Sequence, residues 1–255
     1  MTILEGKIDL VQPDRAIWNE RLDPDLSPDR VRDAETIVGI INHTTGYGVG
    51  LRRLDQRHGE DARTIDGAYA RRMASILTYK ATFMIGRTGL LFQFAPLKYR
   101  THHTGGGKQK RLAAYRADVC DDIPEHEQWW HLRYPYPPGV LDLPVWAPLP
   151  NGKRSPNTRS VGIDWLAPRP GESYTVEQYA TGARLIAFLC DGLNIPADPL
   201  HVNDHSAVHP IDRSRNGKPW DFDSRFDWPG LWRRIRHEIK GWQEMIDKQG
   251  PWGPE

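Results

Sequence analysis

The feature that most constrains the fold is an uninterrupted apolar run, Ile37-Val38-Gly39-Ile40-Ile41. A short run rich in β-branched residues is typical of a strand buried on both faces, as strands of parallel sheets are. The run ends in Asn42-His43-Thr44-Thr45-Gly46, where the chain becomes polar and rich in glycine. We therefore expect a buried central strand with a histidine at its carboxyl end.

Further predicted strands alternate with predicted helices along the chain. Thr175, with Gln178 three residues later, forms a capping box and predicts a helix start. The other predictions are a helix over 67–79, a hairpin over 82–94, strands over 160–166 and 200–203, and helices over 175–192 and 230–248. This alternation predicts an α/β fold, with a mixed central β-sheet flanked by helices.

The 255 residues fit one large domain, which we predict to span 31–250 after an N-terminal arm over 1–30. A segment rich in proline and aromatic residues, about 105–156, is expected to be an insertion, because so many prolines prevent a long regular element. Its aromatic side chains are expected to pack a small core of the insertion in preference to stacking on sugar rings.

Composition excludes several classes of protein. The formal net charge of +1 offers no field that would attract nucleic acid or a membrane surface. Two cysteines cannot build a disulfide framework, and no run approaches the roughly 18 apolar residues of a membrane span. The first residues do not resemble a signal peptide. We expect a globular protein made in the cytoplasm without a signal peptide, with no nucleic-acid partner and no integral membrane association.

Polar residues that could carry chemistry stand at or near strand ends: His43, Asp164, His205 and, after it, Asp221. A zinc hydrolase needs about three nitrogen or oxygen ligands, which His43, His205 and Asp221 could supply. Ten histidines always offer some such triple, so spacing alone leaves structural roles open. His43 could be a hydrogen-bonded core residue, Asp164 could pair with an arginine, and Asp221 could lie in a turn. His201 and His209 are competing ligand candidates.

Five segments, taken in order, resemble the zinc-dependent N-acetylmuramoyl-L-alanine amidases of type 2. That superfamily includes phage lysozyme-like amidases and peptidoglycan-recognition proteins. The segments are IVGIINHTTG, TFMIGRTGLLFQF, THHTGGG, SVGIDWL, and HSAVHP followed by DFDSRFDW. They are similar to the family's first strand with its ligand histidine, its R-D-G hairpin, its W-H-A-G, its S-I-G-I-E strand, and its closing histidine with D-P-G and F-x-W. The resemblance runs from about Ile37 to Trp232, with the insertion outside it.

The resemblance implies that His43, His205 and Asp221 bind Zn²⁺, with Asp223 as the alternative third ligand. Asp164 matches the catalytic glutamate of some members, and is one methylene shorter. His103 matches the histidine of W-H-A-G and is implied to face the substrate. Lys218 is the nearest counterpart of the catalytic lysine, three residues before Asp221 where two are usual.

Together these residues would supply the groups that hydrolysis of an amide needs. Asp164 would take the proton of the attacking water and pass it to the leaving amine. Zinc, with Lys218 or a protonated His103, would stabilise the oxyanion. The implied reaction cleaves the amide between N-acetylmuramic acid and L-alanine, in peptidoglycan or in soluble muropeptides.

The expected place of action is the cell wall, which the chain would reach by an export or lysis route. A phage endolysin, a virion enzyme, an exported effector and a recycling amidase all remain open. The alternative function is an inactive peptidoglycan-binding module or a structural virion component on the same fold.

Overall fold

The structure is a computed structural model. It describes residues 17–18, 31–75, 81–101, 103, 156–199, 201–205, 214–215, 218–219, 222 and 225–249. The predicted insertion lies outside the described residues except for Pro156, and the predicted arm lies outside them except for Ile17–Trp18. The proposed domain boundaries stay predictions.

A mixed six-stranded sheet forms the centre of the described part, in the order β1-β4-β3-β5-β2-β6. The strands are β1 (Ile17–Trp18), β2 (Gly39–Thr44), β3 (Phe83–Ile85), β4 (Leu91–Gln93), β5 (Ser160–Trp165) and β6 (Val202–Asp204). β3, β5, β2 and β6 run parallel, and β4 pairs antiparallel with β3. The predicted α/β class, the mixed sheet and the hairpin over 82–94 are confirmed.

The helices are η2 (Ala34–Thr36), α1 (Val49–His58), α2 (Ala62–Ser75), α5 (Pro156–Arg159), α6 (Val176–Gly192) and α8 (Trp228–Gln249). α6 begins at the predicted capping box, in which Thr175 and Gln178 each bond the other's backbone N–H. α2 begins before the predicted helix over 67–79, and residues 76–79 of that prediction lie outside the described residues. α8 extends slightly beyond the predicted 230–248, and α1 was not predicted. Two short strands, β7 (Ser214–Arg215) and β8 (Lys218–Pro219), form a separate two-stranded sheet.

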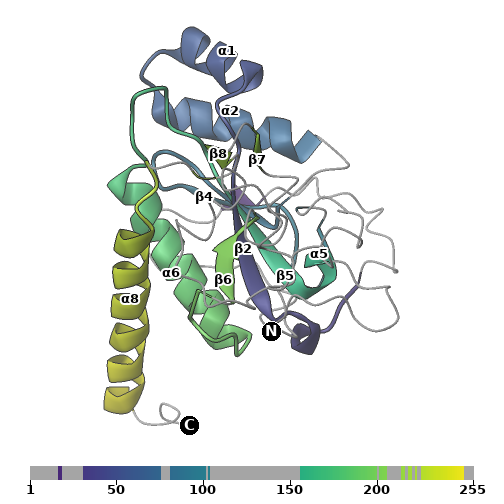
Figure 1. The fold of residues 1–255 in the computed structure, drawn as a ribbon, viewed down its shortest axis with the longest axis vertical. Helices are drawn as coiled ribbons and strands as arrows, with labels where there is room; N and C mark the ends of the chain where they lie inside the picture. The colour runs from purple at the N-terminus through teal and green to yellow at the C-terminus, as the bar shows by residue number, and fades with distance from the viewer. Residues whose placement is uncertain are drawn as a thin grey trace, which may run out of the picture.

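The two faces of the sheet are covered by different pairs of helices. Side chains alternate between the faces along each strand, so Ile40, Ile163 and Trp165 share one face. That face packs against α6 and α8, which lie side by side in Figure 1. The other face carries Met84 and Phe92 and packs against α1 and α2, drawn together at the top of Figure 1. We call the second one the α2 face.

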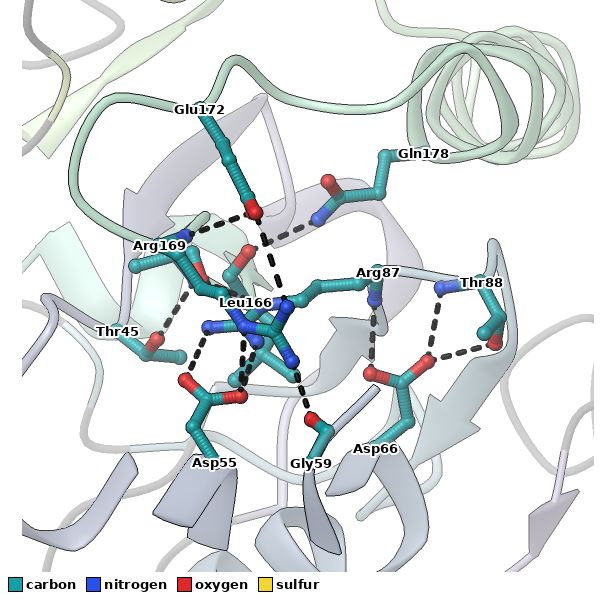
Figure 2. Close-up of polar contacts among 11 residues, drawn as sticks. Thr45, Asp55, Gly59, Asp66, Arg87, Thr88, Leu166, Arg169, Glu172 and Gln178 are labelled. Atoms are coloured by element: carbon teal, nitrogen blue, oxygen red, sulfur yellow. Dashed lines mark hydrogen bonds and ion pairs between the residues drawn. The ribbon is translucent and has the colours of Figure 1, made fainter. Parts of the chain in front are cut away.

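A buried polar network ties α1 and α2 to the hairpin (Figure 2). The Arg87 guanidinium donates to the Asp55 carboxylate of α1 at 2.7 Å, with both side chains at least nine-tenths buried. The Asp66 carboxylate of α2 accepts bonds from the backbone N–H of Arg87 and from the backbone and side chain of Thr88. Arg169 adds a second cation to Asp55 and donates to the carbonyl of Gly59. These bonds compensate for burying the charges and fix both helices against the sheet.

Among the described residues, no helix combines the length and the hydropathy that a membrane span requires.

Candidate functional site

Three predicted site residues meet at one edge of the sheet. His43 and Asp164 are register partners on the parallel strands β2 and β5. His205 directly follows β6, whose register with β2 runs up to the pair Asn42–Asp204. Because carboxyl ends of parallel strands share an edge, His43, Asp164 and His205 come together there. Ligands of α/β proteins bind at such edges, so this is the candidate site.

Three imidazole rings form the centre of the site. The ring centroids of His43 and His205 lie 4.7 Å apart in an edge-to-face arrangement. On its other side, His43 Nε2 lies 3.1 Å from His103 Nδ1. All three side chains are nearly inaccessible, with exposed fractions of 3%, 1% and 1% for His43, His103 and His205. His43 therefore stands between two other imidazoles in a buried setting.

The His103 ring occupies a space that is shaped by β5. A Cβ atom placed on Gly162 would lie only 2.5 Å from His103 Cγ, so only glycine leaves room for the ring. The other ring nitrogen, Nε2, lies 3.3 Å from the Ser160 carbonyl oxygen and 3.2 Å from Ser160 Oγ. The backbone N–H of His103 donates to Asn157 Oδ1 of α5 at 3.0 Å. Local contacts thus fix both the position and the orientation of this ring.

Asp164 lies on the α2 face together with His43, and its exposed fraction is 5%. Burial raises the pKa of the Tyr69 phenol of α2, and the negative charge of Asp164 raises that pKa further. A hydrogen bond with Thr45, the residue after β2, acts in the opposite direction. The phenol is therefore within electrostatic range of the Asp164 carboxyl and belongs to α2, which packs on this face.

His201, the competing ligand candidate, lies at the opposite end of β6. Its backbone carbonyl accepts a bond from Ile40 N–H near the start of β2, and its Nδ1 lies 2.7 Å from Asp198 Oδ1. Four residues of extended chain span about 13 Å, so the structure separates His201 from the cluster around His43.

The proposed third ligands and the remaining candidates are not described. Asp221, Asp223 and His209 lie outside the described residues, and only the backbone of Lys218 is described, in β8. Within the described ranges, no group of three histidine, cysteine or acidic side chains is arranged to hold a metal ion. The donors present, two neighbouring imidazoles with a carboxylate on the same face, are those that zinc prefers in proteins.

A groove of about 540 Å³ lies elsewhere, between α6 and α8. Its lining includes Arg184, Asp227, Arg233 and Glu238. Since α6 and α8 cover the face opposite to the histidines, this groove is not part of the candidate site.

Two features of the site were not predicted from sequence. Tyr69 was not singled out, because it falls within the predicted helix over 67–79 and stands at helical spacing from Met73. The contact between Ser160 and His103 joins residues that are 57 positions apart, on either side of the insertion. No local pattern signals such a contact.

A family model described as N-acetylmuramoyl-L-alanine amidase matches residues 33–219, more than half of the chain. No curated protein sequence matches the chain.

Several solved structures are similar to this chain at low identity. A selenomethionine derivative of AmpD is 17% identical, with 82% of this chain and 90% of that chain covered and a TM-score of 0.41. A mutant endolysin from Bacillus subtilis is 16% identical, with 92% and 99% covered and a TM-score of 0.43. The endolysin amidase LysCS from Clostridium intestinale URNW is 14% identical, with 81% and 88% covered and a TM-score of 0.40.

Proposed function

The chain belongs to the N-acetylmuramoyl-L-alanine amidase family, and from that premise we propose that its reaction takes place at the carboxyl edge of the sheet, around His43. The family's reaction is hydrolysis of the amide bond between N-acetylmuramic acid and L-alanine in peptidoglycan, and the chain is an amidase of this kind. This location is supported by the meeting of His43, Asp164 and His205 at the carboxyl edge of the sheet.

The proposed metal site holds Zn²⁺ through His43, His205 and Asp221, with Asp223 as the alternative carboxylate. The ring centroids of His43 and His205 lie 4.7 Å apart, which supports these two histidines as the nitrogen ligands. When bound, zinc supplies a Lewis acid that activates water and polarises the amide carbonyl.

The place of Phe222 in the chain supports Asp221 or Asp223 as the third ligand. Phe222, which separates Asp221 from Asp223, is fully buried and packs against Trp165 and Tyr174. Trp165 directly follows Asp164 at the end of β5 and points to the opposite face, so Phe222 anchors the chain near this edge, on the side covered by α6 and α8.

Asp164 is the proposed general base. Its carboxylate would take a proton from the attacking water and deliver it to the leaving amine of L-alanine. The shared face of Asp164 and His43 supports this assignment. Burial keeps bulk water away from the carboxylate, which strengthens its interaction with a nearby positive centre. Lys218 is the proposed cation that stabilises the oxyanion as the carbonyl is attacked.

The test is hydrolysis of purified peptidoglycan sacculi and of soluble muropeptides, followed by labelling of newly exposed L-alanine amino groups. We expect release that stops with a zinc chelator and returns when zinc is added back in excess. A preference for sacculi would favour action at the cell wall, and a preference for muropeptides would favour recycling. Release that persists after complete metal removal would contradict the zinc proposal.

A further inference from the structure

We propose that His103 is a positioning residue that holds His43 in the tautomer able to bind zinc through Nδ1. This inference rests on the proposed function, because it concerns the side chain assigned there as a ligand. It differs from the role that the resemblance implies, in which His103 faces the substrate. The contacts of the two nitrogens of His103 carry the inference.

His103 Nε2 lies 3.3 Å from the backbone carbonyl oxygen of Ser160, which can only accept a hydrogen bond. A proton on Nε2 satisfies this contact, whereas a lone pair there would face the carbonyl lone pairs. The carbonyl therefore favours the Nε2–H tautomer of His103.

The tautomer of His103 in turn sets the tautomer of His43. A neutral imidazole with its proton on Nε2 has an acceptor at Nδ1. His103 Nδ1 lies 3.1 Å from His43 Nε2, so His43 Nε2–H donates to it. The lone pair of His43 is then on Nδ1, which becomes the nitrogen that can bind a metal. Ligand histidines are commonly oriented in this way, through a bond from the other ring nitrogen.

The Ser160 hydroxyl offers one route to the opposite arrangement. If Ser160 Oγ–H donated to His103 Nε2 at 3.2 Å, the proton of His103 would move to Nδ1. His43 would then accept at Nε2 and carry its proton on Nδ1, where it blocks metal binding. The two contacts of Ser160 thus decide between a competent and an incompetent site.

The surroundings of Ser160 and His103 hold this arrangement in place. Arg32 Nη1 donates to the same Ser160 carbonyl at 2.6 Å, which fixes the orientation of the acceptor, and a carbonyl oxygen has two lone pairs for two donors. Gly162 leaves space for the imidazole on β5, and Asn157 holds the backbone of His103 through its N–H. A buried ring confined in this way is suited to orienting a neighbour.

The experiment measures zinc affinity by chelator competition in the full chain and three variants. His103→Phe keeps a ring but removes both nitrogens, and we expect zinc affinity to fall by about 10- to 100-fold. His103→Asn places an amide oxygen close to the position of Nδ1, so it keeps the acceptor, and we expect a loss of less than about tenfold. His237→Ala, an exposed histidine of α8, is the control and should bind zinc as the wild type does.

Wild-type zinc affinity in His103→Phe would overturn the inference, and so would equal losses in the Phe and Asn variants. Nitrogen-15 NMR of the metal-free wild type gives an independent answer that needs no variant to fold. We expect His43 to carry its proton on Nε2, and a proton on Nδ1 would overturn the inference. Wild-type protein that binds no zinc would contradict the proposed function instead, and the NMR result would still decide the tautomer.

Discussion

His43 and Asp164 are register partners on the parallel strands β2 and β5, so their side chains leave the sheet on the same face. One is a metal-binding type of side chain and the other is a proton acceptor. A hydrolytic site needs both functions around one reacting water. The sheet brings them together without help from a loop, which makes their spacing a property of the fold.

Replacing Asp164 with Asn should lower kcat for muropeptide hydrolysis by about 10²- to 10⁴-fold, because the amide cannot accept the proton of water. Zinc affinity should stay within a few-fold of wild type, since Asp164 is not a proposed ligand. The measurement is a steady-state rate together with a zinc titration. Asp191→Asn, an exposed carboxylate at the end of α6, is the control. Unchanged kcat in Asp164→Asn would exclude Asp164 as the general base.

Gly162→Ala should displace the His103 ring, since the added Cβ would lie 2.5 Å from His103 Cγ. We expect a loss of about 1–3 kcal/mol in the free energy of unfolding, from overpacking of a buried site. The matched control is Gly241→Ala in α8, where an added Cβ meets no atom within 4 Å. That variant should gain about 0.5–1 kcal/mol. Urea unfolding measures both, and equal effects would show that β5 tolerates a side chain at 162.

The Asp55–Arg87 pair should make stability depend on pH. Burial acts to raise the pKa of Asp55, but hydrogen bonds from Arg87 and Tyr47 outweigh it and lower the pKa below its ordinary value. A carboxyl with a lowered folded pKa stabilises the fold above its unfolded pKa, near 3.9, and loses that contribution as pH falls through the folded pKa.

Asp55→Asn should therefore cost about 3 kcal/mol at pH 7, because Arg87 is left buried beside an uncharged amide. Its stability should also fall less steeply than that of wild type below pH 4. Chemical unfolding between pH 3 and 7 provides the measurement. Parallel stability curves for the two proteins would contradict the role given to this pair.

Cys190 should be unreactive in the folded protein. Burial, and then the negative charges of Asp198 and Asp191, raise the pKa of its thiol to about 12. The nucleophilic thiolate is therefore scarce at pH 8. In a Cys120→Ser background, a thiol reagent should label Cys190 only after denaturant is added. Rapid labelling of the native protein would show that the core around α6 opens easily.

Much of the fold follows from local pattern. The apolar run at 37–41 and the capping box at Thr175 predicted a central strand and a helix start, since burial on two faces and a satisfied helix end leave clear local signals. α1 was missed because its segment offers weak signals: Leu51 is its one fully buried residue, and glycines stand at its start. Contacts with Arg87 and Arg169, made through Asp55, hold this helix in place instead.

The site was predictable only in part. His43 and Asp164 stand at and near the ends of apolar runs, so strand pairing could be expected to bring them to one edge. The neighbours of His103 could not be expected, because the insertion separates Ser160 and Gly162 from His103 in the sequence. The effect of the Asp164 charge on the pKa of the Tyr69 phenol joins residues that are far apart in the sequence, so no local pattern signals it.

The most direct test of the central claim compares two histidines at opposite ends of β6. Release of L-alanine amino groups from peptidoglycan is measured for His205→Ala and for His201→Ala, each with bound zinc determined on the same sample. We expect His205→Ala to lose both zinc and activity and His201→Ala to keep both, because the His201 side chain pairs with Asp198. Full activity in His205→Ala, or loss only in His201→Ala, would contradict the placement of the active site at the carboxyl edge of the sheet.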